Sequence, residues 1–508
     1  MLFSKHHRAN EPTNHRTVII GGGIAGLTVA FNLKSAGHSV LLLEQSSSVG
    51  GCIKTIDRNG FKLEVGPNTF LNSSAELWKL AEDAGLKDEK VETPKKISST
   101  RYIFKDNKLR RVPAGPMLLL SPLLSVCGRL RILAEPFINP PSPPFNKGGN
   151  FSAPLPNKGE MLCAPPFEKG GNFSVPPFEK GGSGGILPDE SLATFISRRL
   201  GKEVLDTLVT PFVSGIHAGD PALLSAKATF PKLVEAEQKY GGIFKGMKAL
   251  KGDLKATGLG SFKGGIGELA TALERRLGDS IIKNARVMSV EKVNHSYKIT
   301  FEEDGLVNHI VSSSVVVALP AYAAAKALEG ISDELGHTLS RIEYAPIVVI
   351  HAGYKSEDIP RRLDGFGYLV PRRQLVRTLG CLFSSALFPG RAPEGHELLT
   401  CFAGGMLDPE AADLTDGDLL RLVQADLAKT LGIKSAPVFT NITRYTHAIP
   451  QYHIGHLKRI GRINGLLEKL PGLFITGSYF DGISVADTAS HANRVATAVI
   501  AHLRKSPF

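Results

Sequence analysis

Three glycines near the start of the chain, Gly21, Gly23 and Gly26, have the G-x-G-x-x-G spacing of a dinucleotide-binding turn. Gly21 permits the tight turn, Gly23 lets the backbone approach a pyrophosphate, and Gly26 lets a helix pack closely on a strand. A helix that begins near Ile24 would point its free N–H groups and its positive dipole end at the phosphates. The candidate loop residues are Gly21, Gly22, Gly23, Ile24, Ala25 and Gly26.

The elements on either side of this loop favour the same ligand. The apolar run 17–20 predicts a strand before the loop, and the run 40–43 predicts a second strand after the helix. Glu44 follows that second strand, where a carboxylate accepts hydrogen bonds from a ribose, and Gln45 is its neighbour. Strand, turn, helix, strand and acid in this order predict a dinucleotide site.

Turns beyond Glu44 favour a flavin–adenine dinucleotide (FAD) over a nicotinamide cofactor. The glycine pair Gly50 and Gly51 lets a second stretch of backbone approach an extended ligand, and a further turn follows at 66–69. The alternative is a glycine hairpin that binds nothing. The candidate residues of these turns are Gly51, Cys52, Gly66, Pro67, Asn68 and Thr69.

The last part of the chain contains a similar pattern. Residues 473–479 read as a buried strand that breaks at Gly477, and an amphipathic helix follows Ile483, Ser484 and Val485. The N-terminus of such a helix suits the pyrimidine edge of a flavin, where negative charge accumulates on reduction. The two ends of the chain therefore predict one site, although a core helix without a ligand is the alternative.

Composition limits the class of protein. The chain has 508 residues, enough for two to four domains, and is 42% hydrophobic and 21% charged, which is typical of globular proteins. Its five scattered cysteines form no C-x-x-C pair, which fits a reducing compartment and a cytoplasmic protein. The polar leader 1–15 is not a secretory signal, and no apolar run is long enough to span a membrane, so only peripheral contact is expected.

The formal net charge of +12 favours anionic partners. The basic residues are dispersed and no nucleic-acid-binding motif accompanies them, so we expect no nucleic-acid partner. A carboxylated substrate or an acidic lipid surface accounts for the charge as well.

One stretch of sequence repeats. Four Pro/Gly-rich units recur every 11 residues, with Lys147, Lys158, Lys169 and Lys180 in register. Paired prolines and glycines exclude a helix, so we predict that the insert 140–186 is a disordered surface loop that catalysis does not need. An array of binding motifs is the alternative.

Several strings inside the chain resemble the oxygen-dependent protoporphyrinogen oxidase family, which includes bacterial coproporphyrinogen III oxidases and lies within the flavin monoamine oxidase superfamily. The resemblance covers residues 16–503 apart from the repeats. The strings are Arg101-Tyr102-Ile103, Asp189-Glu190-Ser191, Arg198-Arg199-Leu200-Gly201, Pro211 to Asp220, Gly365 to Pro371, Phe388 to Pro393, Ala448 to Tyr452 with Gly455-His456, and Gly477 to Asp487.

This resemblance implies an α/β fold with a discontinuous Rossmann-like FAD-binding domain, a strand-rich α+β substrate domain and a helical domain that contacts a membrane. The expected boundaries are 16–95, 256–330 and 440–508 for the FAD domain, 96–110 and 331–439 for the substrate domain, and 111–255 for the helical domain. Residues 189–250 also read as helical, and 340–405 as rich in strands.

The implied activity is the six-electron oxidation of protoporphyrinogen IX or coproporphyrinogen III with FAD as cofactor, O2 as acceptor and H2O2 as product. The resemblance assigns Arg101 to a substrate propionate, Phe366 and Leu369 to the faces of the macrocycle, and Gly215 to a close backbone approach. It adds Val287 and Tyr445 to the cofactor residues named above. No side chain is a certain catalyst, because the flavin carries the chemistry.

The resemblance admits the membrane surface and ferrochelatase as partners, and either a monomer or a homodimer. Alternative functions are an amine oxidase or carotenoid-type desaturase, and a flavin- or porphyrin-binding paralogue without turnover. His447, His453 and His456 suggest a metal site, but no cysteine joins them and Pro450 interrupts the segment, so we predict no metal. His491 stands where the family has a glycine, and Tyr445 where an indole is common.

Overall fold

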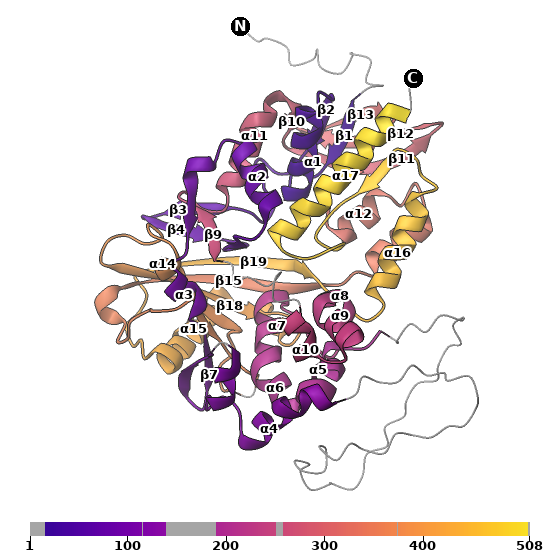
Figure 1. Cartoon of the computed structure of the whole chain (residues 1–508). Coiled ribbons are helices and arrows are strands. Elements are labelled where there is room, and N and C mark those ends of the chain that lie inside the picture. The colour runs from indigo at the N-terminus through magenta and orange to yellow at the C-terminus, as the bar shows by residue number, and fades with distance from the viewer. Residues whose placement is uncertain (1–15, 114, 139–188, 250–257, 373, 506–508) are drawn as a thin grey trace, which may run out of the picture.

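The computed structural model describes residues 16–113, 115–138, 189–249, 258–372 and 374–505 (Figure 1). The predicted leader 1–15 and the predicted repeat insert 140–186 lie outside these residues. Helices and several sheets alternate along the chain, which confirms the α/β class. In the described part of the chain, no helix is both long and apolar enough to cross a bilayer.

A parallel sheet carries the glycine loop, with the strand order β10–β2–β1–β14–β20. Its strands are β1 (Thr17–Ile20), β2 (Val40–Leu43), β10 (Ile281–Ile282), β14 (Val315–Val317) and β20 (Leu473–Ile475). Every residue of β1, β2 and β14 is buried, as expected for apolar strands of a parallel sheet that is covered on both faces.

The two faces of this sheet have different covers, because successive side chains of a strand point to opposite faces. Ile19 packs into a cluster with α1 (Ile24–Ser35), α2 (Ala75–Asp83), α11 (Glu268–Leu277) and α17 (Val485–Lys505). Val18 packs into a cluster with β11 (Ala285–Val293), β12 (Ser296–Glu303), β13 (Leu306–Ser312), α12 (Ala321–Ala327), α13 (Asp333–Ser340) and α16 (His456–Leu467). Strands β11, β12 and β13 form an antiparallel sheet.

A second large sheet has the order β19–β15–β18–β17–β16–β7–β8. Its strands are β7 (Tyr102–Lys105), β8 (Lys108–Arg111), β15 (Tyr344–Lys355), β16 (Gly367–Leu369), β17 (Gly380–Phe383), β18 (His396–Gly404) and β19 (Phe439–Pro450). Only the β7–β16 pair of this sheet is parallel in the described residues. Helix α15 (Asp416–Leu431) packs against the sheet, and the strand-rich reading of 340–405 is confirmed.

The helical region predicted over 189–250 is also confirmed. It contains α5 (Leu192–Leu200), α6 (Lys202–Val204), a π-helical turn η5 (Leu205–Val209), α7 (Thr210–His217), α8 (Ala226–Thr229), α9 (Pro231–Tyr240) and α10 (Ile243–Ala249). Before the insert lie η3 (Gly115–Leu120), α4 (Val126–Ala134) and η4 (Glu135–Phe137). Helices α4 and α5 share one apolar cluster, which lies at the end of the molecule opposite α1 (Figure 1).

Short elements complete the described chain. They are the hairpin β3 (Thr55–Arg58) and β4 (Phe61–Glu64), the small sheet of β5 (Phe70–Leu71), β9 (Leu259–Phe262) and β6 (Lys90–Glu92), α3 (Lys95–Ser99), α14 (Ser384–Leu387), and the 3-10 turns η2 (Lys87–Glu89), η6 (Gly278–Ser280), η7 (Ser356–Asp358) and η8 (Pro409–Asp413). The strand predicted over 473–479 is shorter than expected and ends at Ile475, because beyond Thr476 the backbone turns away from β14. The domain boundaries stay predictions.

Candidate active site

The glycine loop joins β1 to α1 in the way that its spacing predicts. Gly21 has a φ of +102°, and a Cβ atom there would lie 2.7 Å from the carbonyl oxygen of Ala318. A Cβ atom at Gly26 would lie 1.9 Å from the carbonyl oxygen of Gly21. At Gly23, by contrast, an added Cβ would meet nothing within 4 Å. The loop is therefore packed against the protein at Gly21 and Gly26 and is open at Gly23, where a ligand would approach.

Glu44 lies directly beside this loop. The side chain is 7% exposed, and its carboxylate accepts hydrogen bonds from the Gly22 amide at 2.6 Å and the Ser46 amide at 2.8 Å. Gln45 between them is exposed. The Ala285 amide donates to the Glu44 carbonyl oxygen at 2.8 Å, so β11 begins here and carries Val287 at an irregularity in its pairing.

The turns that follow Glu44 stack on the first loop. The Gly50 amide donates to the Gly22 carbonyl oxygen at 2.8 Å, and an added Cβ at Gly51 would lie 3.3 Å from the Cα of Gly23. An added Cβ at Gly66 would lie 2.0 Å from the Cys52 carbonyl oxygen. The half-buried residues of this third turn are Gly66, Pro67, Asn68 and Thr69. The chain thus brings three backbone turns together around the opening at Gly23.

Cys52 and Tyr445 link the loops to the second large sheet. The Cys52 thiol is exposed, yet the surrounding protein desolvates it and raises its pKa. Burial, with a smaller contribution from the charge of Cys52, raises the pKa of Tyr445 on β19 to about 12. Cys52 and Tyr445 are therefore near enough for their charges to interact, which places the second turn close to β19.

Gly477, Ile483 and Ser484 lie between β20 and α17, and Val485 is the first residue of α17. An added Cβ at Gly477 would lie 2.5 Å from the Tyr479 ring, and Ile483 packs against the helical cluster. Ser484 caps α17, since its hydroxyl accepts from the Asp487 amide at 3.0 Å and donates to the Asp487 carboxylate at 2.6 Å. Figure 1 shows α17 beside α1, and Asn32 of α1 donates to Asn493 of α17 at 2.6 Å. Both chain ends therefore contribute to one layer of helices.

The residues predicted to hold a substrate lie at the two ends of β16, and we call this set the strip. Arg101 precedes β7 and Phe366 precedes β16, and the parallel pairing of these strands places the guanidinium carbon 5.3 Å from the centre of the Phe366 ring. At the other end of β16, an added Cβ at Gly215 of α7 would lie 2.5 Å from a methyl group of Leu369. Phe366 and Leu369 are half-buried. Arg101 is exposed, yet burial by the surrounding protein lowers its pKa. The strip places one cation beside an apolar surface.

Sequence reasoning missed a buried ion pair that joins the hairpin β3–β4 to the chain between β17 and β18. Arg391 and Glu64 are 2% and 6% exposed in their side chains and lie 3.0 Å apart. Glu64 also accepts from the Thr55 hydroxyl at 2.7 Å and the Ile266 amide at 3.0 Å. Burial raises the pKa of Glu64, while the charge of Arg391 opposes the rise. A signal was available: Glu64 is a charged residue between the apolar Leu63 and Val65, just before the turn predicted over 66–69.

The histidines considered for a metal point to different partners. His456 contacts the Tyr479 carbonyl oxygen, His447 packs against the Tyr322 ring, and His453 lies 3.8 Å from the Glu343 carboxylate. In the described residues, no cluster of His, Cys, Asp and Glu is arranged to hold a metal ion.

Burial also determines how the protein responds to acid. It lowers the pKa of several histidines, from 6.5 to about 4, and these are His217, His351, His456 and His491. Each stays neutral in the folded protein at a pH where the unfolded chain binds a proton. Their contribution to stability is therefore complete above about pH 6.5 and is lost as the pH falls toward 4.

We expect the urea midpoint of unfolding to fall steeply between pH 6.5 and 4.5, with an uptake of up to one proton for each of these histidines. Each buried histidine contributes at most about 3 kcal/mol, since one pKa unit corresponds to about 1.4 kcal/mol. The slope of the free energy of unfolding against pH reports the proton uptake. Substituting His351→Gln should reduce this uptake by about one proton, whereas His295→Gln at an exposed position should not change it. An equal slope in both variants would contradict the assignment.

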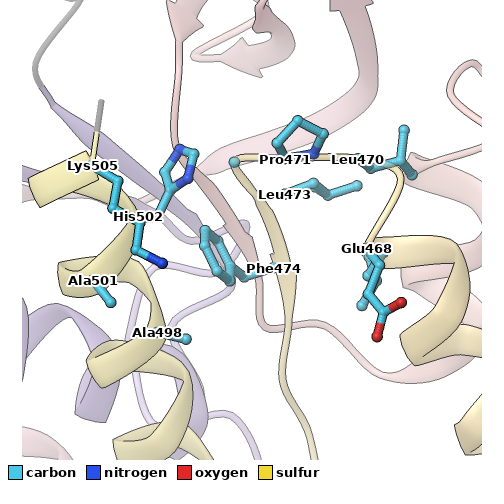
Figure 2. A pocket seen from close by; sticks show the side chains of 11 residues that line it. Glu468, Leu470, Pro471, Leu473, Phe474, Ala498, Ala501, His502 and Lys505 are labelled. Atoms are coloured by element: carbon cyan, nitrogen blue, oxygen red, sulfur yellow. The ribbon is translucent and has the colours of Figure 1, made fainter. Parts of the chain in front are cut away.

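A separate pocket lies at the start of β20, away from Gly477 (Figure 2). Its volume is about 350 Å³, and it opens between the ends of α16 and α17. Phe474 and Ala498 line it together with His502 and Lys505. None of the predicted site residues lines this pocket, so it is not part of the candidate active site.

Three comparisons with known proteins bear on this site. The family model described as flavin containing amine oxidoreductase matches residues 24–500. The chain is 31% identical over 518 residues to the chloroplastic protoporphyrinogen oxidase of Nicotiana tabacum, covering 97% of this chain and 86% of that protein. It is 28% identical over 508 residues to the coproporphyrinogen III oxidase of Bacillus subtilis (strain 168), covering 96% and 98%. Cyclohexylamine oxidase from Brevibacterium oxydans IH-35A has the same fold, with a TM-score of 0.66, 18% identity, and coverage of 97% and 100%.

Proposed function

We propose that this chain, which belongs to the family of flavin-containing amine oxidoreductases, is an FAD-dependent porphyrinogen oxidase of haem biosynthesis. Relatives named protoporphyrinogen oxidase and coproporphyrinogen III oxidase match nearly its whole length. The observation that carries the proposal is the strip formed by Arg101, Phe366, Leu369 and Gly215. A guanidinium at the edge of an apolar surface suits a flat ring that bears carboxylates. An amine substrate would leave that cation without a partner.

The residues of the three turns fit FAD. The opening at Gly23 leaves space for a diphosphate at the N-terminus of α1, and the Glu44 carboxylate lies where a ribose would bind. The second and third turns extend the site for a ligand longer than one nucleotide. The chemistry that bound FAD would supply is a hydride acceptor for the porphyrinogen that O2 reoxidises. Six electrons leave the macrocycle in three passes, and three O2 become three H2O2.

The side chains of the strip then have binding and orienting roles. Arg101 would pair with a propionate, and its contact with the Phe366 ring holds the guanidinium in place before the substrate arrives. Phe366 and Leu369 would cover the macrocycle and exclude water from it. Gly215 has no side chain, so helix α7 can lie against Leu369 without pushing it into the substrate space.

Substituting Arg101→Ala should raise the KM for porphyrinogen by roughly 10- to 150-fold and leave the FAD content unchanged. A charge-assisted hydrogen bond that is shielded from water contributes about 1.5–3 kcal/mol. Arg101→Lys should recover only part of the loss, because lysine keeps the charge but not the planar fork. Lys108→Ala on the neighbouring strand β8 is the control, with a KM close to that of the wild type. An unchanged KM in Arg101→Ala would remove this residue from the site.

Anaerobic mixing of the FAD-loaded protein with each porphyrinogen tests the function. We expect flavin absorbance to bleach with a porphyrinogen but not with putrescine or cyclohexylamine, and H2O2 to form when air is admitted. Bleaching by an amine alone would replace the proposal with an amine oxidase. A protein that binds flavin but bleaches with no substrate would be the non-catalytic paralogue.

The same experiment decides between the two porphyrinogens. Coproporphyrinogen III has four propionates and protoporphyrinogen IX has two, so a basic rim favours the first. The formal charge of +12 supports coproporphyrinogen III weakly, because most of that charge is remote from the site. A larger kcat/KM for protoporphyrinogen IX would overturn this preference.

An apolar stripe on α4 supports peripheral binding to a membrane. Val126, Leu130 and Leu133 of α4 are 69%, 57% and 53% exposed, and their spacing places them on one helix face. Phe137 of the following 3-10 turn η4 is 86% exposed. Leu120 before α4 is 74% exposed. Such a stripe suits insertion into the headgroup region of a bilayer. The proposal therefore places the enzyme in the cytoplasm at the inner face of the membrane, where ferrochelatase could take up the porphyrin.

The double substitution Leu130→Glu with Phe137→Glu should reduce sedimentation with anionic lipid vesicles at least tenfold. Each large apolar side chain that enters the bilayer interface contributes about 1.5–3 kcal/mol. The matched control is Leu306→Glu with Val307→Glu, a pair that is also exposed but lies on β13. Equal vesicle binding by both double variants would exclude α4 as the contact.

A further inference from the structure

Residues 477–484 form the turn that leads from β20 into α17, and they contain no helix or strand. Tyr479 and Phe480 of this turn are 0% and 5% exposed. Buried backbone without regular pairing needs other partners for its carbonyl groups. The turn carries Gly477 and leads to the residues expected beside the flavin, so the partners that fix it also fix that part of the site.

Those partners come from the segment 450–456, between β19 and α16. The Tyr452 hydroxyl donates to the Ser478 carbonyl oxygen. The Gly482 backbone also forms a hydrogen bond with this hydroxyl. The His456 ring lies 2.9 Å from the Tyr479 carbonyl oxygen through Nε2. Tyr452 and His456 are 3% and 0% exposed. Two buried side chains thus hold three positions of the turn.

The rings of Tyr452 and His456 support each other. Their centres lie 4.2 Å apart and their planes differ by 10°. A carbonyl oxygen is only an acceptor, so Nε2 of His456 must carry the proton. Burial lowers the pKa of His456 to about 4, which keeps the ring neutral. The stacked pair therefore presents two donors, one hydroxyl and one N–H, to two neighbouring carbonyl groups.

The segment itself is anchored on three residues outside it. The side-chain amide of Gln451 donates to the His217 carbonyl oxygen at the end of α7 at 2.9 Å. The Ser225 amide donates to the Tyr452 carbonyl oxygen at 2.8 Å, and the Gly455 amide to the Asp189 carboxylate at 2.7 Å. These bonds leave the stacked pair little freedom to move away from the turn.

We propose that Tyr452 and His456 are positioning residues that hold the turn 477–484 in the conformation that binds FAD. This inference rests on the proposed function, because it takes the start of α17 to be the flavin side of the site. Neither residue needs to touch the flavin. Their effect passes through the Ser478 and Tyr479 carbonyl groups to the backbone of the turn.

The test measures the Kd of FAD for the apoprotein by quenching of flavin fluorescence, with no porphyrinogen present. His456→Leu should weaken binding about tenfold, since it leaves the buried Tyr479 carbonyl without its donor. His456→Gln keeps an N–H donor at a similar reach and should recover most of the affinity. Tyr452→Phe keeps the stacked ring, so a folding defect is not expected, and should weaken binding several-fold. The matched control is His453→Leu, three residues away on the same segment, with a Kd within about twofold of the wild type.

Each outcome decides the matter. A Kd in His456→Leu and Tyr452→Phe equal to that of the wild type would overturn the proposal, as would an equal loss in His453→Leu or a failure of His456→Gln to recover. The reduction potential of the bound flavin should shift in His456→Leu and return in His456→Gln, which a general loss of stability would not produce. Failure of the proposed function is seen separately, as wild-type protein that binds FAD but bleaches with neither porphyrinogen.

Discussion

Substituting Gly23→Asp should abolish FAD binding while the protein still folds. An added Cβ at Gly23 meets no protein atom within 4 Å, so the new side chain would occupy ligand space only. Its carboxylate would also repel the diphosphate at the N-terminus of α1. Gly23 is the N-cap of α1 with a φ of −70°, and aspartate is a favourable N-cap residue in that conformation. We therefore expect the melting temperature of the apoprotein to stay the same or rise slightly.

Flavin absorbance per mole of purified protein measures this effect. The control is Gly461→Asp on α16, a glycine at which an added Cβ also meets nothing within 4 Å. This variant should keep its full flavin content. A Gly23→Asp protein that purifies yellow, with the flavin content of the wild type, would show that the loop after β1 does not hold the diphosphate.

Of the single substitutions proposed for this protein, Arg391→Leu should have the largest effect on stability. It should lower the free energy of unfolding by about 3–5 kcal/mol. Removing one partner of a buried ion pair leaves the other charge buried and uncompensated. Glu64 would keep its bonds from Thr55 and Ile266 but lose its cation. The double variant Glu64→Leu with Arg391→Leu should recover much of the loss, because no unpaired charge remains. The urea midpoint of unfolding measures all of these variants.

The penalty in Arg391→Leu should also depend on pH. The pKa of Glu64 is already raised by burial, and Arg391 opposes that rise, so its removal raises the pKa further. A folded carboxyl with a raised pKa binds a proton more readily than the unfolded chain, and its stability cost is relieved as the pH falls. The difference from the wild type should therefore be smaller at pH 5.5 than at pH 8.

The matched control is Arg462→Leu, whose partner Glu334 is exposed. An exposed pair contributes at most about 1 kcal/mol, and its loss should show no such pH dependence. If Arg391→Leu were no more destabilising than Arg462→Leu, the buried pair would not connect the hairpin β3–β4 to the second large sheet as described.

Two sets of buried polar contacts, the Glu64–Arg391 ion pair and the bonds of Tyr452 and His456, lie beside different turns of the site. Glu64 ends β4 directly before the third turn, and Arg391 comes from the chain between β17 and β18. Tyr452 and His456 bond to the last turn, and their neighbour Gln451 bonds to the His217 carbonyl oxygen at the end of α7, two residues from Gly215. The first set connects a predicted cofactor turn to the second large sheet, and the second connects one to the segment that bonds to α7. A change at either one is expected to reach the site without touching a ligand.

The sequence alone predicted the parts of the site whose geometry is local. The G-x-G-x-x-G spacing predicted the strand, the turn and the helix, because Gly26 must pack on the Gly21 carbonyl group only five residues away. The strand over 473–479 and the helix after Val485 were predicted from local apolar patterns, although the strand ends at Ile475 and the helix begins at Val485. The substrate residues came from the resemblance to a family, since no spacing relates Arg101, Gly215 and Phe366.

Only the tertiary structure decided which distant residues meet. Arg101 and Phe366 are neighbours because β7 pairs with β16 in parallel, and Gly215 reaches Leu369 because α7 packs at the end of that strand. The Glu64–Arg391 pair and the bonds of Tyr452 and His456 to the Ser478 and Tyr479 carbonyl groups depend on the same long-range arrangement. Local backbone geometry follows from residue type and spacing, whereas these contacts exist only after the sheets have paired and their buried polar groups have had to find partners.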